Sequence, residues 1–188
     1  MTDVAALVTQ ASQRDWRTVM VPGDTATVQA VVLALVAAGI DVVRQRGVDD
    51  PLRVEGSVDA ELWLDDVVSR MPRCDLGRTV VPGGMVVVEA SLGADQLLPV
   101  MVGVDRVGLV VGREGATRRI DVADGAVAVR ALTPWPLSEL DEHMAGRACR
   151  LVTRTADWVG GEVVHDTPCH LSWFRHEPRE PRPGPVTS

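Results

Sequence analysis

The sequence Arg-Thr-Val-Met-Val-Pro-Gly at residues 17–23 returns in shortened form as Arg-Thr-Val-Val-Pro-Gly at residues 78–83. In both places β-branched residues run into a Pro-Gly pair, which predicts a strand that ends in a turn. Three further pairs of similar segments follow in the same order, namely 39–43 with 103–107, 54–58 with 123–127, and 64–71 with 137–144. Because the order is kept, we interpret the sequence as an internal duplication.

Each copy is predicted to form a β-α-β-β-α unit. In the first copy Asp24 is the expected N-cap of a helix, and Gly39 is expected to end it. Between them apolar side chains recur at helical spacing, at Val28, Val31, Val32, Leu35 and Val36. In the second copy Asp124-Gly125 is the preferred pair for a type I′ hairpin turn. The predicted fold class is therefore α+β: the two diverged units form one antiparallel or mixed sheet, with helices packed on one face.

The predicted domain organisation follows from the duplication. We expect a single domain over residues 1–176, with pseudo-repeats at about 16–77 and 78–147 and a C-terminal β-hairpin over 148–176. Residues 177–188 are dense in Pro and Arg and cannot bury much apolar surface, so they are predicted to form a disordered tail.

The composition narrows the classes of partner. Hydrophobic residues make up 46% of the 188 residues and charged residues 24%, so the chain is expected to fold. The net charge of −7 argues against a nucleic-acid partner, which requires a basic surface. The longest apolar run, Ala30 to Ile40, is about half the ~20 residues of a membrane-spanning helix, so no membrane partner is expected.

Two features of the sequence predict a cytoplasmic location, and a third indicates the type of genome. The segment that begins at Met1 carries Asp3 and no basic residue before its apolar residues, unlike a signal peptide. The cysteines are odd in number and follow no disulfide framework, which favours a reducing compartment. Every basic residue is Arg and none is Lys, which is typical of a GC-rich, actinobacterial-type genome. The cysteines are Cys74, Cys149 and Cys169.

No motif in the sequence predicts catalysis. The Gly-rich segments 81–84 and 111–115 lack the spacing of phosphate-binding loops and are interpreted as turns. The acidic groups at 65–66 and 139–142 open predicted helices, where the helix dipole favours negative charge. We therefore predict no catalytic residue and no cofactor, and we expect that the protein is not an enzyme.

A cluster of histidines and a cysteine near the C-terminus is the candidate metal site. It consists of His165, Cys169, His170 and His176, residue types that can bind zinc. Neighbouring residues of a strand point to opposite faces, however, which would separate Cys169 from His170. An ordinary polar strand end is the favoured interpretation, and no metal is predicted.

The tryptophans supply the candidate binding residues. Trp63 and Trp135 fall at corresponding positions of the two copies and are candidate walls of a small-molecule pocket between them. Packing in the core is the favoured interpretation for the tryptophans as a group. Trp158, Trp173 and Phe174 lie beside Gly160-Gly161 or beside the tail, so they are the candidates for exposure and for anchoring a protein partner.

The chain also resembles the EspG-type chaperones of actinobacterial type VII secretion. The resemblance lies in the order of elements over residues 17–174. The stretch Asp105 to Ala145 is similar to the family's strand–strand–helix pattern, and Leu171-Ser172-Trp173-Phe174 is similar to a late strand. The Asp-Thr and Gly-Arg-Tyr segment that follows in the family is absent here, so no functional residue is carried over. The resemblance implies a cytosolic α/β protein with two similar halves that binds a helical tip of its partner.

These observations favour a non-catalytic protein-binding module: an adaptor, a chaperone-like protein or an assembly subunit. The first alternative is a small-molecule-binding domain with its pocket between the two repeats. The second alternative is a metal- or thiol-dependent enzyme that uses the segment from His165 to His176. A protein partner is expected in the first case and a small molecule in the others.

Overall fold

A computed structural model describes residues 2–45, 56–64, 76–91, 100–101, 106–113, 116–123, 126–132, 137–163 and 169–177. Within these ranges it describes all side chains except those of residues 91–132 and of residue 169. Among the described residues, no helix is long and apolar enough to cross a membrane.

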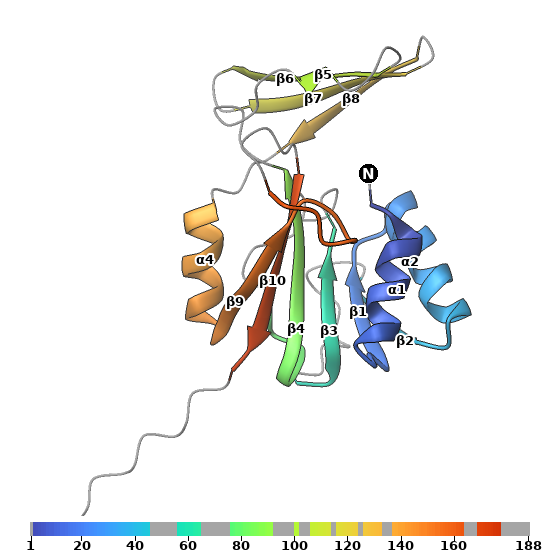
Figure 1. Ribbon diagram of the computed structural model, residues 1–188, viewed down its shortest axis with the longest axis vertical. Coiled ribbons are helices and arrows are strands. Elements are labelled where there is room, and N and C mark those ends of the chain that lie inside the picture. The colour runs from blue at the N-terminus through green and yellow to red at the C-terminus, as the bar shows by residue number, and fades with distance from the viewer. Residues whose placement is uncertain are drawn as a thin grey trace, which may run out of the picture.

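A six-stranded sheet forms the centre of the fold (Figure 1). Four neighbouring strands run parallel, β10 is antiparallel to β4, and β9 is antiparallel to β10. In spatial order the strands are β2 (Asp41–Gln45), β1 (Thr18–Pro22), β3 (Val58–Trp63), β4 (Val80–Ser91), β10 (Cys169–His176) and β9 (Cys149–Thr155).

The first three elements after residue 17 form a parallel β-α-β unit. Strand β1 is closed by Pro22 and Gly23, and helix α2 (Ala26–Ala37) follows and leads back to β2. The N-cap of α2 is Thr25 rather than Asp24, because the Thr25 side chain accepts a hydrogen bond from the backbone N–H of Val28 at 3.2 Å. Because β1 and β2 are parallel, the helix between them has to cross over one face of the sheet.

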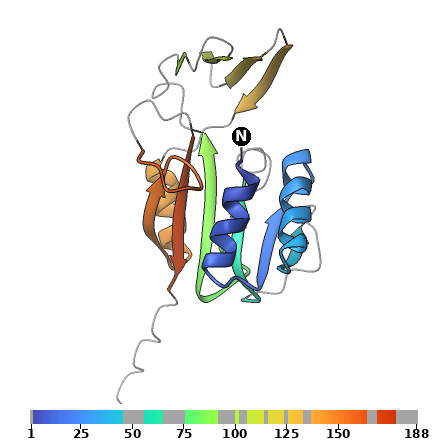
Figure 2. The ribbon, with the colours of Figure 1, turned by 45° about the vertical axis from the view of Figure 1, so that its right-hand side comes forward.

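Helices cover both faces of the sheet, which corrects the prediction of helices on one face. Helix α1 (Val4–Gln13) packs beside α2 on one face, and α4 (Leu137–Gly146) lies against β9 on the other (Figure 2). The central strand β4 is accordingly buried on both sides, with Val86, Val87 and Val88 at most 1% exposed. The fold is therefore a mixed, largely parallel α/β sheet and not the α+β arrangement that the sequence predicted.

The predicted internal duplication is also wrong. Residues 17–23 contain the whole of β1 and the glycine that follows it, whereas residues 78–83 lie at the start of β4. The Pro-Gly pair therefore ends one strand and lies near the beginning of the other. Strand β4 continues through its Pro-Gly pair by a bulge, since Val58 pairs with Val80 but Ala60 pairs with Met85. A Cβ atom at Gly84 would lie 2.7 Å from the carbonyl oxygen of Asp59, so this bulge requires a glycine.

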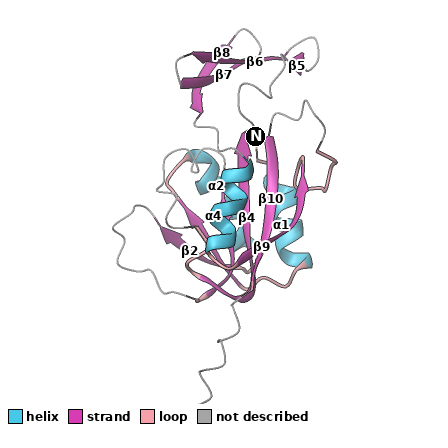
Figure 3. Cartoon of the chain, turned by 90° about the vertical axis from the view of Figure 1, so that its left-hand side faces the viewer, coloured by secondary structure: helices cyan, strands magenta, loops and turns pink. Residues whose placement is uncertain are grey.

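The rest of the supposed second copy forms a separate antiparallel sheet. Its order is β5 (Val100–Met101), β6 (Arg106–Arg113), β7 (Ala116–Ala123) and β8 (Ala126–Leu132). This sheet lies beyond the end of the main sheet at which β4 finishes, in the view of Figure 1 and in that of Figure 3. The chain then returns through α4 to β9 and β10, which pair antiparallel.

Candidate functional site

The order of the strands reverses between β1 and β3, since the chain adds β2 on one side of β1 and β3 on the other. In open α/β sheets, ligands bind outside the carboxyl ends of the strands at such a reversal. The described residues at this edge come from the β1–α2 corner, from the end of β2, and from the end of β4. This edge of the sheet is therefore the candidate functional site.

The β1–α2 corner is a tight turn held by β2. Gly23 has a φ of 93°, a conformation that disfavours any residue with a side chain. Its N–H donates to the carbonyl oxygen of Gln45 at 2.8 Å. The guanidinium of Arg44 donates to the carbonyl oxygen of Gly23 at 3.0 Å and to a carboxylate oxygen of Asp24 at 3.1 Å. Asp24 remains 62% exposed, so the corner presents a carboxylate to solvent beside a half-buried cation.

The amino terminus of α2 adds a positive dipole end to this corner. The helix begins three residues after Gly23, and its first N–H groups have no partner within the helix. Such a helix end favours negative or electron-rich ligand groups. The corner between β1, α2 and β2 therefore combines backbone donors, a carboxylate and a guanidinium.

The end of β4 contributes a second carboxylate to the same edge. Glu89 is only 5% exposed and accepts a hydrogen bond from the hydroxyl of Thr2 at 2.6 Å. Thr2 immediately precedes Asp3, the N-cap of α1. The bond thus brings the start of α1 to the carboxyl edge of the sheet, although 87 residues separate the two side chains.

The predicted partner anchors are buried, so the expectation that they are exposed is wrong. Trp158, Trp173 and Phe174 are 2%, 3% and 1% exposed. The indoles of Trp158 and Trp173 meet edge to face with centroids 5.5 Å apart, and the Trp173 N–H donates to the hydroxyl of Thr155 at 3.1 Å. Strand β10 lies second from the edge of the sheet, between β4 and β9, which explains why these side chains are covered.

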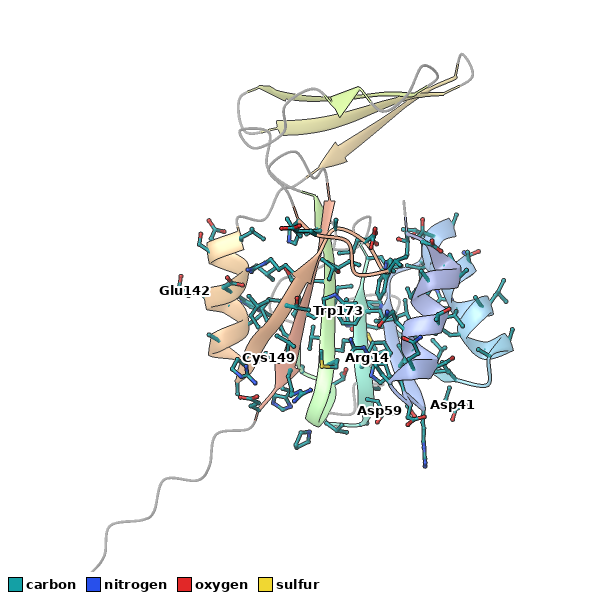
Figure 4. The ribbon with its side chains drawn as sticks, in the orientation of Figure 1. Arg14, Asp41, Asp59, Glu142, Cys149 and Trp173 are labelled. Carbon is teal, nitrogen blue, oxygen red and sulfur yellow. The ribbon has the colours of Figure 1, made fainter. Side chains whose placement is uncertain are left out.

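Arg14 completes this aromatic cluster. Its guanidinium carbon lies 4.7 Å from the centroid of the Trp173 ring, and both residues are labelled in Figure 4. Trp16 lies on the other side of Trp173, with centroids 6.5 Å apart. These contacts join the end of α1 to β10 and serve the packing of the core.

Of the two predicted pocket residues, the structure describes only Trp63. It is fully buried, and its indole N–H donates to a carboxylate oxygen of Glu61 at 2.8 Å. Trp135 lies outside the described residues, so the predicted pairing of the two tryptophans stays a prediction.

The four candidate metal ligands are not brought together among the residues that the structure describes. His170 is fully buried in β10, and the Nδ1 atom of His176, six residues later, lies 3.3 Å from the carbonyl oxygen of Val81. His165 and the side chain of Cys169 lie outside the described part of the chain. Within that part, no three potential metal-binding side chains are grouped.

Cys149 is expected to react slowly with thiol reagents. It lines a surface groove of about 360 Å³ between α4 and β9, yet it is only 3% exposed. Burial, and to a smaller extent the charge of Glu61, raises the pKa of its thiol to about 12, so the reactive thiolate is scarce at neutral pH.

This prediction can be measured with Ellman's reagent on a chain that carries Cys74→Ser and Cys169→Ser. We expect the remaining thiol to react at least about tenfold faster in denaturant than in the folded protein. Equal rates in the two conditions would contradict the burial of Cys149.

Comparisons with known proteins identify the fold. No protein-family model and no curated protein sequence matches the chain. Among solved structures, the CcbJ methyltransferase of Streptomyces caelestis shares 17% identity, covers 93% of this chain and 89% of its own, and has a TM-score of 0.65. The SAM-bound amino pentose methyltransferase CalS10 of Micromonospora echinaspora shares 16% identity over 93% and 90% of the two chains, with a TM-score of 0.61. DesVI of Streptomyces venezuelae shares 13% identity over 92% and 89%, with a TM-score of 0.64.

At these identities the similarity establishes the fold only, but it corrects several interpretations. The neighbours are consistently S-adenosylmethionine (SAM)-dependent methyltransferases, so the resemblance to EspG-type chaperones is wrong. The same matches overturn the interpretation of the chain as a non-catalytic, chaperone-like binding module. They favour the alternative of a protein that binds a small molecule.

The β1–α2 corner was not predicted, because its sequence contains no complete glycine motif of a phosphate-binding loop. A usable signal was present. A β-branched run, Pro-Gly, a capping residue, a helix and a second strand follow one another within 28 residues, from Thr18 to Gln45. That order is typical of a parallel β-α-β unit, whose first turn commonly meets a ligand.

Proposed function

We propose that this chain binds SAM at the β1–α2–β2 corner and transfers its methyl group to a small-molecule acceptor. The observation that carries the proposal is the Gly23 corner at the reversal of strand order, in a fold similar to SAM-dependent methyltransferases over 93% of the chain. The odd number of cysteines favours a cytoplasmic location, which agrees with this proposal.

The described residues at the corner fit the polar groups of this ligand. SAM carries an ammonium and a carboxylate on its amino acid part, and the corner offers the Asp24 carboxylate beside the Arg44 guanidinium. Gly23 has no side chain to obstruct the approach of a ligand to the backbone. The Nε atom of Arg44 is buried and has no hydrogen-bond partner, so it is a donor that a ligand or an ordered water could satisfy.

When bound, SAM would supply an electrophilic methyl group on a sulfonium. The residues of this chain would bind and orient it: Asp24 would pair with the ammonium, and Arg44 with the carboxylate. The acceptor is expected on the β4 side, where Glu89 and Thr2 meet and beyond which the second sheet lies (Figure 3). Holding the two reactants together in a fixed orientation is then the main contribution of the protein.

The first test is calorimetric titration of the full chain with SAM. We expect saturable binding by the natural chain and at least about tenfold weaker binding by Gly23→Ala, because a side chain at this φ moves the corner. Gly39→Ala is the matched control. Gly39 also has a positive φ of 80°, but it lies at the other end of α2 with no atom within 4 Å of an added Cβ.

Two outcomes would contradict the proposal. Absence of SAM binding by the natural chain would refute the ligand. Equal affinities of Gly23→Ala and Gly39→Ala would refute the corner as its site. Methyl transfer itself is measured as formation of S-adenosylhomocysteine with a panel of small amines that includes amino sugars, since CalS10 is an amino pentose methyltransferase.

A further inference from the structure

Helices α1 and α2 contain no charged residue. Their sequences are VAALVTQASQ and ATVQAVVLALVA, in a chain of which 24% of the residues are charged. Helix α4, on the opposite face, shows the ordinary pattern: Glu139 and Glu142 are exposed, and Glu142 points away from the sheet in Figure 4. A helix at the surface of a globular protein normally carries charged residues on its outer side. The α1–α2 layer therefore lacks the charged residues of a typical solvated surface, although α1 exposes the polar residues Thr9, Ser12 and Gln13.

The outer side of α2 exposes large apolar side chains. Leu33 is 72% exposed and Val36 is 56% exposed. Small residues flank them on the same side of the helix, at Ala26, Ala30 and Ala37, all of which are exposed. The inner side carries Val28, Val31 and Leu35, which are fully buried. Gln29 is the one polar residue exposed on this outer side, one helical turn before Leu33. A helix that is mainly apolar on both sides is expected to be covered on both sides.

The charge distribution indicates what covers this layer. The chain has a net charge of −7, so two copies repel one another through most of their surfaces. The α1–α2 layer is the exception, because it brings no charge to a contact. It also offers no charged group with which to select a different partner, whereas a second copy presents the same uncharged surface.

The size of the layer suits a small dimer interface. The 12 residues of α2 span about 18 Å, and the neighbouring α1 adds about 10 Å of width. Two such layers in contact would bury roughly 1,000 Å² in total, which is close to the lower limit for a specific interface. An isologous pair of antiparallel α2 helices would place each Leu33 among the small residues of the facing helix.

We propose that the outer surface of α1 and α2, centred on Leu33 and Val36, is a homodimer interface that joins this chain to a second copy of itself. The carboxyl edge of the sheet stays open in this arrangement, because Leu33 lies about 10 Å along the helix from Ala26. This inference does not depend on the proposed ligand.

The test is sedimentation equilibrium of the full chain from about 1 to about 200 µM, a range that covers weak dimers of this interface size. We expect the natural chain to show a reversible monomer–dimer equilibrium. Leu33→Glu should raise the dissociation constant at least tenfold, because it places a carboxylate in the centre of the contact. Its circular dichroism spectrum should remain that of the natural chain, since Leu33 touches solvent rather than the core.

Val152→Glu is the matched control. Val152 is 46% exposed in β9, the edge strand at the opposite side of the sheet from β2, whereas α2 packs on β1 and β2, so this variant should dimerise as the natural chain does. A natural chain that stays monomeric over the whole range would overturn the proposal. So would a dimer that Leu33→Glu leaves intact, or one that Val152→Glu weakens as much as Leu33→Glu does.

Discussion

Replacing Glu61 by Ala is expected to lower the free energy of unfolding by about 4 kcal/mol, the largest effect that we predict for any single substitution. Glu61 lies in the middle of β3 and is completely buried. Its two carboxylate oxygens accept four hydrogen bonds: from the Trp63 indole at 2.8 Å, the Gly77 N–H at 2.7 Å, the Thr79 N–H at 2.8 Å and the Thr79 hydroxyl at 2.6 Å.

The size of this effect follows from the donors that the substitution leaves behind. Removing the carboxylate leaves four hydrogen-bond donors inside the protein without an acceptor. Each buried donor without a partner lowers the stability by about 1 kcal/mol or more. Three of them belong to the turn that precedes β4, so the start of the central strand loses its attachment to β3. Glu61→Gln keeps the shape but turns an amide NH₂ toward two of the donors, and we expect a loss of about 2 kcal/mol.

Urea unfolding followed by tryptophan fluorescence measures these differences. Glu142→Ala on the exposed side of α4 is the control, and a surface change of this kind should stay within about 0.5 kcal/mol of the natural chain. If Glu61→Ala were no less stable than Glu142→Ala, the four hydrogen bonds could not be what attaches the turn to β3.

Acidification from pH 6.5 to pH 4 is expected to destabilise the fold by up to about 3 kcal/mol through His170 alone. In the folded protein His170 is completely buried in β10, with 0% of its surface exposed. It meets solvent only when the chain unfolds. Burial, and to a smaller extent the positive charge of Arg154, lowers the pKa of its imidazole in the folded protein to about 4. In the unfolded chain the ordinary value is about 6.5.

The sign follows from proton binding. Between pH 6.5 and pH 4 the unfolded state holds a proton on this imidazole that the folded state does not hold, so lowering the pH favours unfolding. The contribution of neutral His170 to stability is present above pH 6.5 and is lost progressively as the pH falls toward 4. Below that value both states are protonated, and this contribution changes no further.

The measurement is the free energy of unfolding in urea at several pH values across this window. The natural chain also loses stability through its carboxylates, so the diagnostic quantity is the difference between chains. His170→Gln should flatten the dependence between pH 4 and pH 6.5, whereas His176→Gln, at a partly exposed position of the same strand, should keep the natural slope. Identical slopes for the natural chain and His170→Gln would exclude His170 as the source.

The position of helix α2 could be predicted from the sequence. The apolar spacing from Val28 to Val36 is that of α2, and Gly39 does follow the end of this helix, with a φ of 80°. The similar Pro-Gly pairs were misleading because the same dipeptide serves two purposes. Pro22-Gly23 ends a strand at the ligand edge, whereas Pro82-Gly83 forms a bulge within β4. The dipeptides themselves do not distinguish these roles. The roles are set by the strand that pairs beside each dipeptide, which is β2 for Pro22-Gly23 and β3 for Pro82-Gly83.

The candidate site could not be predicted from the sequence, because its residues meet only in the folded chain. Thr2 and Glu89 are 87 residues apart, and Gly23 meets Gln45 only because β1 and β2 run parallel. The burial of side chains could not be predicted either, since the sequence places Trp158 beside Gly160-Gly161 and Trp173 near the C-terminal segment, where surface residues are expected. Both are nevertheless buried, because they pack against each other and Trp173 also contacts Trp16, which follows α1.

By itself, the amino-acid sequence determined where some helices and strands lie, such as β1, α2 and β2, because periodicity, caps and Gly or Pro residues act over a few neighbouring positions. Only the tertiary structure decided the direction in which strands pair, the burial of the aromatic residues and the assembly of the carboxyl edge. Those properties depend on contacts between residues far apart in the chain. Local patterns constrain such contacts weakly, because the same apolar strand can pair in either direction.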